Sequence, residues 1–156
     1  DTLARMLWQW AVIVALSMTP NLILGQSIAA LLGIRWGLDP WALIPVMTVF
    51  GYLEGVGVAY LSERFMRIRF VARWVTRTRT PRAVRFADRW GPWGGMTLGV
   101  ALVGQEPILL ALRWLGVDMR RLWIPLAAAN LLSAIGYYFL LKAGWLAGTG
   151  SYLPSI

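Results

Sequence analysis

Long apolar stretches separated by short polar breaks run along this chain, and they predict helices embedded in a membrane. Residues 5–24, 41–61 and 122–141 are each apolar over about the 20 positions that a helix needs to cross a bilayer. Two further apolar pieces, residues 26–36 and 107–116, are too short to cross. The pattern predicts an all-α integral membrane protein.

Each short piece follows a polar or glycine-rich break. Pro20-Asn21 interrupts the end of the first stretch, since proline lacks the backbone donor and its ring clashes with the preceding turn. Gly25-Gln26 then opens the first short piece, and Gly104-Gln105 precedes the second after the glycine-rich residues 90–104. Each half therefore predicts a re-entrant or broken helical hairpin followed by one spanning helix.

The two halves resemble each other in sequence. At an offset of 79 residues, segment 25–61 matches segment 104–140 at nine of 37 positions. Four matches are Leu pairs, which are frequent in such a composition. The other five join Gly25 to Gly104, Gln26 to Gln105, Gly37 to Gly116, Asp39 to Asp118 and Gly57 to Gly136. We interpret the chain as a duplicated unit.

These patterns divide the chain into four parts: a first membrane repeat (1–61), an arginine-rich loop with an interfacial helix (62–89), a second membrane repeat (90–142) and a C-terminal tail (143–156). Asp39-Pro40 and Thr80-Pro81 each predict a helix start, with a capping side chain followed by a first-turn proline.

Composition agrees with a membrane protein. Hydrophobic residues make up 58% of the chain and charged residues 14%, with a mean hydropathy of +0.60; soluble domains have about 25% charged residues. The chain has no Cys and no His, which excludes disulfides and Cys/His metal sites. It also shows no nucleophile–base set and no phosphate-binding loop. We therefore expect neither enzyme activity nor a cofactor or metal.

Segment 62–89 carries nine arginines against two acidic residues. An excess of arginine between membrane segments indicates the cytoplasmic side, so we expect a bacterial inner-membrane protein with this loop in the cytoplasm. In a helix that starts at Pro81, Arg82, Arg85 and Arg89 share one face, where they are candidates for contact with anionic lipids. Nucleic-acid binding is not expected, because the arginines lie between spanning segments.

Counting crossings gives the relation between the halves. A hairpin that returns to its own side plus one spanning helix makes an odd number of crossings, so the two repeats are inverted. Asp39 then lies outside and Arg120-Arg121 inside, as the charge rule favours. If the first stretch instead crosses fully and the short piece does not return, the repeats are parallel. The charge distribution favours inversion.

The two Gly-Gln breaks are the first candidate site. Non-helical backbone at membrane depth is tolerated only inside the protein or beside a wet cavity, so we expect both breaks to face a shared interior. Gln26 and Gln105 then either bind a ligand or satisfy backbone groups freed at the break. Asn130, within the last spanning stretch, adds a third interior amide.

Two acidic residues extend this candidate site. An ionisable group within a membrane segment is by default a candidate for function, and Glu54 and Glu106 are candidate proton carriers. Glu54 could instead reach Arg64 or Arg67 near the end of its helix. Gly51, Gly55, Gly57 and Gly136 are expected to be close-packing positions between helices. 

Arg113 lies near the end of the second short piece. It either extends to the nearer membrane surface or faces a cavity and binds a phosphate or carboxylate with two hydrogen bonds.

Three stretches carry a family resemblance: residues 86–95 (FADRWGPWGG), 104–107 (GQEP) and 115–121 (LGVDMRR). Through them, residues 20–142 resemble the small multidrug export family of bacterial membrane proteins and, more distantly, the DedA (VTT-domain) proteins. The resemblance implies inverted re-entrant hairpins and transport of lipid phosphates or proton-coupled transport.

Together these features favour a small transporter-like protein. It would move a small or lipid-phosphate substrate at the interface of two inverted repeats. Its expected partners are membrane lipids and a second copy of the chain or a larger membrane complex. The expected pathway residues are Gln26, Glu54, Gln105, Glu106, Arg113 and Asn130. The alternative is an accessory subunit or assembly factor of a larger membrane complex.

Overall fold

The structure is a computed structural model that describes residues 2–19, 25–100 and 104–149. These residues form helices and turns without β-strand, which confirms the predicted all-α class. The elements in chain order are α1 (Thr2–Ser17), α2 (Gly25–Arg35), α3 (Pro40–Met66), α4 (Arg69–Thr78), α5 (Pro81–Trp90), the π-helix η2 (Gly91–Gly99), α7 (Gln105–Trp114), the short 3₁₀-helix η3 (Met119–Arg121) and α8 (Trp123–Thr149).

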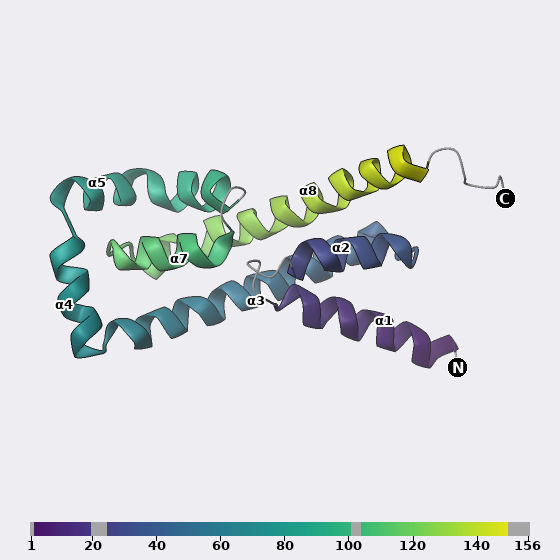
Figure 1. Cartoon of the computed structure of the whole chain (residues 1–156), viewed down its shortest axis with the longest axis horizontal. Coiled ribbons are helices and arrows are strands. Elements are labelled where there is room, and N and C mark those ends of the chain that lie inside the picture. The colour runs from purple at the N-terminus through teal and green to yellow at the C-terminus, as the bar shows by residue number, and fades with distance from the viewer. Residues whose placement is uncertain (1, 20–24, 101–103, 150–156) are drawn as a thin grey trace.

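Two long helices run through the molecule in opposite directions and pack against each other (Figure 1). They are α3 and α8, each of 27 residues, and each is long and apolar enough to cross a membrane by length and composition. Both exceed the stretches predicted from sequence. α3 continues to Met66, into the polar region, and α8 continues through residues 143–149, which the sequence pattern assigned to a tail.

The remaining apolar helices form two hairpins that enter from opposite ends of the molecule (Figure 1). α1 and α2 pack together at one end, while α5 with η2 packs along α7 at the other. α1 has only 16 residues, shorter than a spanning helix. The predicted break at Pro20-Asn21 lies outside the described residues. In both hairpins, the second helix begins near the middle of the molecule and runs back to the end where the hairpin started.

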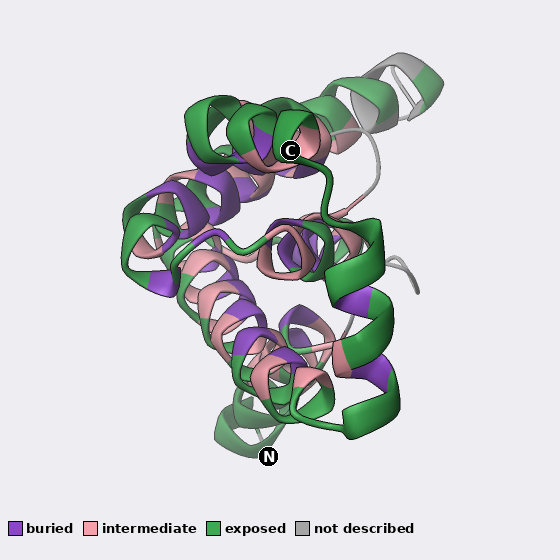
Figure 2. Ribbon diagram, turned by 90° about the vertical axis from the view of Figure 1, so that its left-hand side faces the viewer, coloured by how far each residue is buried: buried purple, intermediate pink, exposed green. Residues whose placement is uncertain are grey.

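The hairpins pack on the long helices in a reciprocal way. α2 contacts α8 and α1 contacts α3, while α7 contacts α3 and η2 contacts α8. Each hairpin thus places its second helix on the long helix of the opposite half of the chain. Figure 2 shows that exposed residues lie mainly on the outward faces of this assembly and buried residues between the helices.

The turn between short and long helix is the same in both halves. Gly37 and Gly116 have positive φ angles of 68° and 88°, a conformation that favours glycine. The following residue donates its N–H to a carbonyl five residues back, Leu38 to Gly33 (2.9 Å) and Val117 to Leu112 (3.0 Å), as helix C-caps with a glycine commonly do. The same hydrogen-bonded turn therefore ends each hairpin.

An aspartate begins the next helix in both halves. The Oδ1 atoms of Asp39 and Asp118 accept a hydrogen bond from the backbone N–H two residues on, at 3.1 Å in each case. Asp39 is therefore the N-cap of α3, and Pro40 is its first residue, as predicted. Thr80 likewise caps α5, its Oγ1 accepting from the N–H of Ala83 at 3.2 Å.

The buried faces of α3 and α8 coincide at the offset of 79 residues. The inward positions of α3 are spaced four apart, and each has a buried counterpart in α8. The pairs are Leu43 and Leu122, Met47 and Leu126, Gly51 and Asn130, Gly55 and Ala134, and Ala59 and Tyr138. Only the first pair is identical in sequence. The repeat is thus much clearer in burial than in residue identity.

Candidate polar centre between the hairpins

Gln26 is the second residue of α2 and Gln105 is the first residue of α7, and both are only 1% exposed. The residue before each is a glycine for a different reason. A Cβ atom on Gly25 would lie 2.5 Å from the carbonyl oxygen of Leu16, whereas Gly104 has φ of 100°. Close backbone approach and a left-handed turn therefore place the two amides in the interior, as the sequence predicted.

Asn130 joins the two glutamines. Its Oδ1 accepts a hydrogen bond from Nε2 of Gln26 (3.2 Å), and its Nδ2 donates to Oε1 of Gln105 (2.9 Å). Asn130 Nδ2 also donates to the carbonyl of Leu126, one turn back in α8 (2.9 Å). Three buried amides, one from each of α2, α7 and α8, thus form a continuous chain. We call Gln26, Gln105, Asn130 and Glu54 the polar centre.

Glu54 of α3 completes the polar centre. Gln105 Nε2 donates to the Glu54 carboxylate and to the carbonyl of Gly51 (3.0 Å). The three amides donate one after another toward Glu54: Gln26 to Asn130, Asn130 to Gln105 and Gln105 to Glu54. Glu54 is thereby placed at the hairpin interface and bound to Gln105. Glu54 therefore has a partner in the polar centre, whereas the alternative interpretation made it a partner of Arg64 or Arg67 only.

The glycine at position 51 makes room for the polar centre. A Cβ atom built there would lie 2.0 Å from Nε2 of Gln26 and 2.5 Å from Oδ1 of Asn130. Gly51 is also the counterpart of Asn130 at the offset of 79. One half of the duplicated unit thus supplies the amide, and the other half supplies the space it occupies.

Glu106 follows Gln105 in the first turn of α7 and is 4% exposed. Its carboxyl group lies close to that of Glu54, so two acidic side chains meet where α7 packs against α3.

Several acceptor atoms of the centre remain open. Among the described residues, Gln26 Oε1 and Glu54 Oε1 are buried and have no hydrogen-bond partner. Buried polar atoms are nearly always paired in proteins, so these two oxygens are the atoms of the polar centre that a further hydrogen-bond donor would meet. The described part of the chain contains no group of three or more acidic side chains that could hold a metal ion.

A groove of about 590 Å³ leads to Glu106 between α3 and α7. Its walls are mostly apolar, with Val58, Leu61, Phe65 and Leu110 among them, and Arg64 also lines it. A groove with apolar walls, a cationic residue and a buried carboxyl group has the chemistry to take an amphipathic molecule.

Arg113 lies apart from the polar centre. It is eight residues from Gln105 along α7, or about 12 Å at 1.5 Å per residue. Its guanidinium pairs with Glu63 of α3 (2.7 Å) and donates to the carbonyl of Val117 (2.8 Å). The side chain is 15% exposed. The structure thus gives Arg113 a partner in the protein, which neither sequence alternative anticipated, and does not bring it to the other predicted pathway residues.

Arginines also join the α4–α5 region to the second hairpin. Arg79 Nε donates to the carbonyl of Trp114 (2.7 Å), at the C-terminal end of α7, and Arg121 pairs with Asp88. Sequence reasoning missed both contacts, because the partners are more than 30 positions apart. Arg82, Arg85 and Arg89 remain exposed on α5.

Comparison of the chain with models of protein families, with curated proteins and with solved structures finds no match.

Proposed function

We propose that this chain is a small transporter-like protein of the bacterial inner membrane. It moves a small or lipid-phosphate substrate through the polar centre at the interface of two inverted repeats. The observation that carries the proposal is that both hairpins and both long helices contribute to one buried hydrogen-bonded site, formed by Gln26, Gln105, Asn130 and Glu54. Paired interrupted helices meeting near the middle of a membrane are typical of transporter sites.

Two features support inverted repeats. The reciprocal packing of the hairpins and the identical glycine turns relate one half to the other. In addition, α5 and η3 lie at the same end of the molecule, as the contact between Arg121 and Asp88 requires. The arginines of segment 62–89 and of 120–121 therefore gather on one side, which the charge rule assigns to the cytoplasm.

The groove beside Glu106 supports a lipid-phosphate substrate. Its apolar walls suit acyl chains, and Arg64 suits a phosphate. The resemblance to DedA proteins supports the same substrate class. The carboxyl pair Glu54 and Glu106 provides a place for a coupling proton. On this proposal the substrate reaches the centre laterally, from the lipid beside α3 and α7.

Lipid flux in proteoliposomes tests the function. Dithionite bleaching of NBD-labelled phosphatidylglycerol reports movement between leaflets, and the wild type is expected to accelerate it relative to protein-free vesicles. Glu54→Gln and Gln105→Leu remove groups of the polar centre and are expected to lower the rate at least about tenfold, equivalent to 1.4 kcal/mol. Ser133→Ala, at the position of α8 that corresponds to Glu54, is the matched control and keeps the rate. Wild-type flux in both polar-centre variants would contradict the proposal.

One observation favours the second candidate, an accessory subunit of a larger membrane complex. The amides of Gln26, Gln105 and Asn130 bond mainly to one another, as they would in a purely structural contact. The exposed surface also carries large aromatic residues, such as Trp41 and Phe70, that a partner could cover. Copurification with a stoichiometric partner, together with no flux by the isolated chain, would decide for this candidate.

A further inference from the structure

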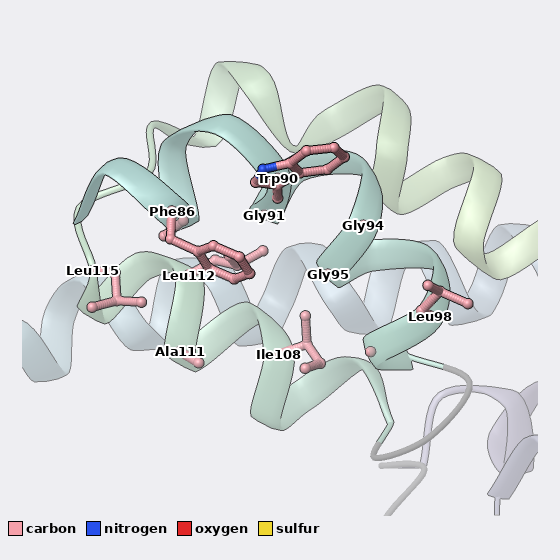
Figure 3. A pocket seen from close by; sticks show the side chains of 12 residues that line it. Phe86, Trp90, Gly91, Gly94, Gly95, Leu98, Ile108, Ala111, Leu112 and Leu115 are labelled. Carbon is pink, nitrogen blue, oxygen red and sulfur yellow. The ribbon is translucent and has the colours of Figure 1, made fainter. Parts of the chain in front are cut away.

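An apolar groove of about 500 Å³ opens between the two arms of the second hairpin (Figure 3). Phe86 and Leu115 lie at one end of it and Leu98 at the other. Trp90, Ile108 and Leu112 line the space between them. Along α7, the groove extends over seven residues, or about 10 Å.

Glycines of η2 create this space. Gly91 and Gly99 allow the two arms to approach closely. A Cβ atom on Gly91 would lie 2.4 Å from Leu112, and one on Gly99 would lie 2.7 Å from Ile108. Gly94 and Gly95 leave room for a small side chain, because a Cβ atom there would lie at ordinary contact distance from its nearest neighbour, 3.9 and 3.5 Å. The groove therefore runs along a glycine-rich arm that closely approaches α7 at Gly91 and Gly99.

A stripe of three arginines runs beside the groove. On a helix with 3.6 residues per turn, Arg82, Arg85 and Arg89 cover one face of α5, and Phe86 and Trp90 lie on the adjoining face. The Arg89 guanidinium lies 5.7 Å from the centroid of the Trp90 ring. All three arginines are exposed. Cationic side chains therefore border the apolar lining directly.

No acidic residue of α5 neutralises this stripe. The single acid of the helix, Asp88, projects from a different face and pairs with Arg121 of η3. A second copy of the chain docked here by a twofold axis would bring arginines close to arginines, which is unfavourable. A ligand that carries an anionic group next to an apolar chain matches both the charge and the lining.

We propose that this groove binds one acyl chain of an anionic bilayer phospholipid, whose phosphate lies against Arg82, Arg85 and Arg89. The inference rests on the membrane location in the proposed function, but not on transport. In the proposed orientation, the α5 end of the groove lies at the cytoplasmic surface, where lipid phosphates are found, and the Leu98 end lies deeper among the acyl chains. The bound acyl chain fills the space between the two arms of the second hairpin.

Native mass spectrometry of the purified full chain tests this site, with dioleoyl-phosphatidylglycerol and dioleoyl-phosphatidylcholine as the probes. The wild type is expected to retain one phosphatidylglycerol per chain in preference to phosphatidylcholine. Replacing Arg82, Arg85 and Arg89 together by Gln should lower phosphatidylglycerol retention at least about tenfold. Ala111→Trp, which fills the groove from α7, should lower retention of both lipids.

Two matched controls separate this site from general surface effects. Replacing Arg69, Arg73 and Arg77 of α4 by Gln removes the same charge away from the groove, and Ala127→Trp adds the same ring to an exposed position of α8. Both should retain lipid as the wild type does. Two results would overturn the inference. One is that the control and test variants lose the same amount of lipid. The other is that the wild type forms a dimer without bound lipid and that Ala111→Trp dissociates this dimer.

Fractionation of cells distinguishes the two proposals. A chain found in the membrane fraction that retains no phosphatidylglycerol overturns the lipid site alone. A chain absent from the membrane fraction overturns the proposed function as well.

Discussion

Gly51→Ala is expected to destabilise the protein by about 2–4 kcal/mol and to abolish flux. The added methyl group would lie 2.0 Å from Gln26 Nε2 and 2.5 Å from Asn130 Oδ1, so both amides must move. Overpacking a buried site destabilises by about 1–3 kcal/mol, and an unmade buried hydrogen bond adds about 1–3 kcal/mol. The gain in helix propensity, about 1 kcal/mol, is smaller. Thermal unfolding in detergent, monitored by circular dichroism, measures the change.

Gly57→Ala supplies the matched control within the same helix. Gly57 is exposed, and a Cβ atom there would meet no heavy atom within 4 Å. The same substitution six residues further along α3 should therefore leave stability unchanged or raise it by up to about 1 kcal/mol. Equal effects of the two substitutions would show that the space at Gly51 has no special role in the polar centre.

Asn130→Leu is the second substitution with a large expected effect. Leucine is similar in size but removes the acceptor for Gln26 and the donor for Gln105. Two buried amides then lose partners, each loss amounting to about 1–3 kcal/mol, and stability is expected to fall by at least about 2 kcal/mol. Flux should be lost as well, because the two hairpins are no longer joined.

A double-mutant cycle isolates this contact. Gln105→Leu combined with Asn130→Leu should destabilise less than the sum of the single changes, with a coupling energy of about 0.5–3 kcal/mol, since the side chains touch. Asn130→Leu combined with Arg113→Gln should be additive, because Arg113 binds Glu63 at the far end of α7. Additivity in the first cycle would mean that Asn130 does not join the glutamines.

The polar residues of the centre could be found from sequence, but their connections could not. The repeated Gly-Gln breaks identify Gln26 and Gln105, and the rule that a polar residue inside an apolar segment must find a partner identifies Glu54 and Asn130. Which of them touch depends on how α2 and α7 pack against α8 and α3. Arg113 was grouped with them for the same reason. Its actual partner, Glu63, lies in α3, 50 residues away.

The fold was predicted where local chemistry decides it. Asp39 and Thr80 mark helix starts because their side chains cap nearby N–H groups. The ends of α3 and α8 were placed too early, since both helices continue into polar or glycine-rich residues that hydropathy excludes. The prediction that glycines allow close packing between helices is correct for Gly51 and Gly55. It was wrong for Gly57 and Gly136, whose added Cβ atoms would meet nothing within 4 Å.

Cysteine labelling can measure the membrane topology directly, because the chain contains no native cysteine. Single cysteines are introduced at the exposed positions Thr2 and Arg35, which bound the first hairpin, and at Arg67 and Arg120. Intact cells are then treated with a membrane-impermeant maleimide. Inverted re-entrant hairpins predict labelling at positions 2 and 35 from outside, and at 67 and 120 only after the cells are opened. Labelling of positions 2 and 35 from opposite sides of the membrane would contradict the account.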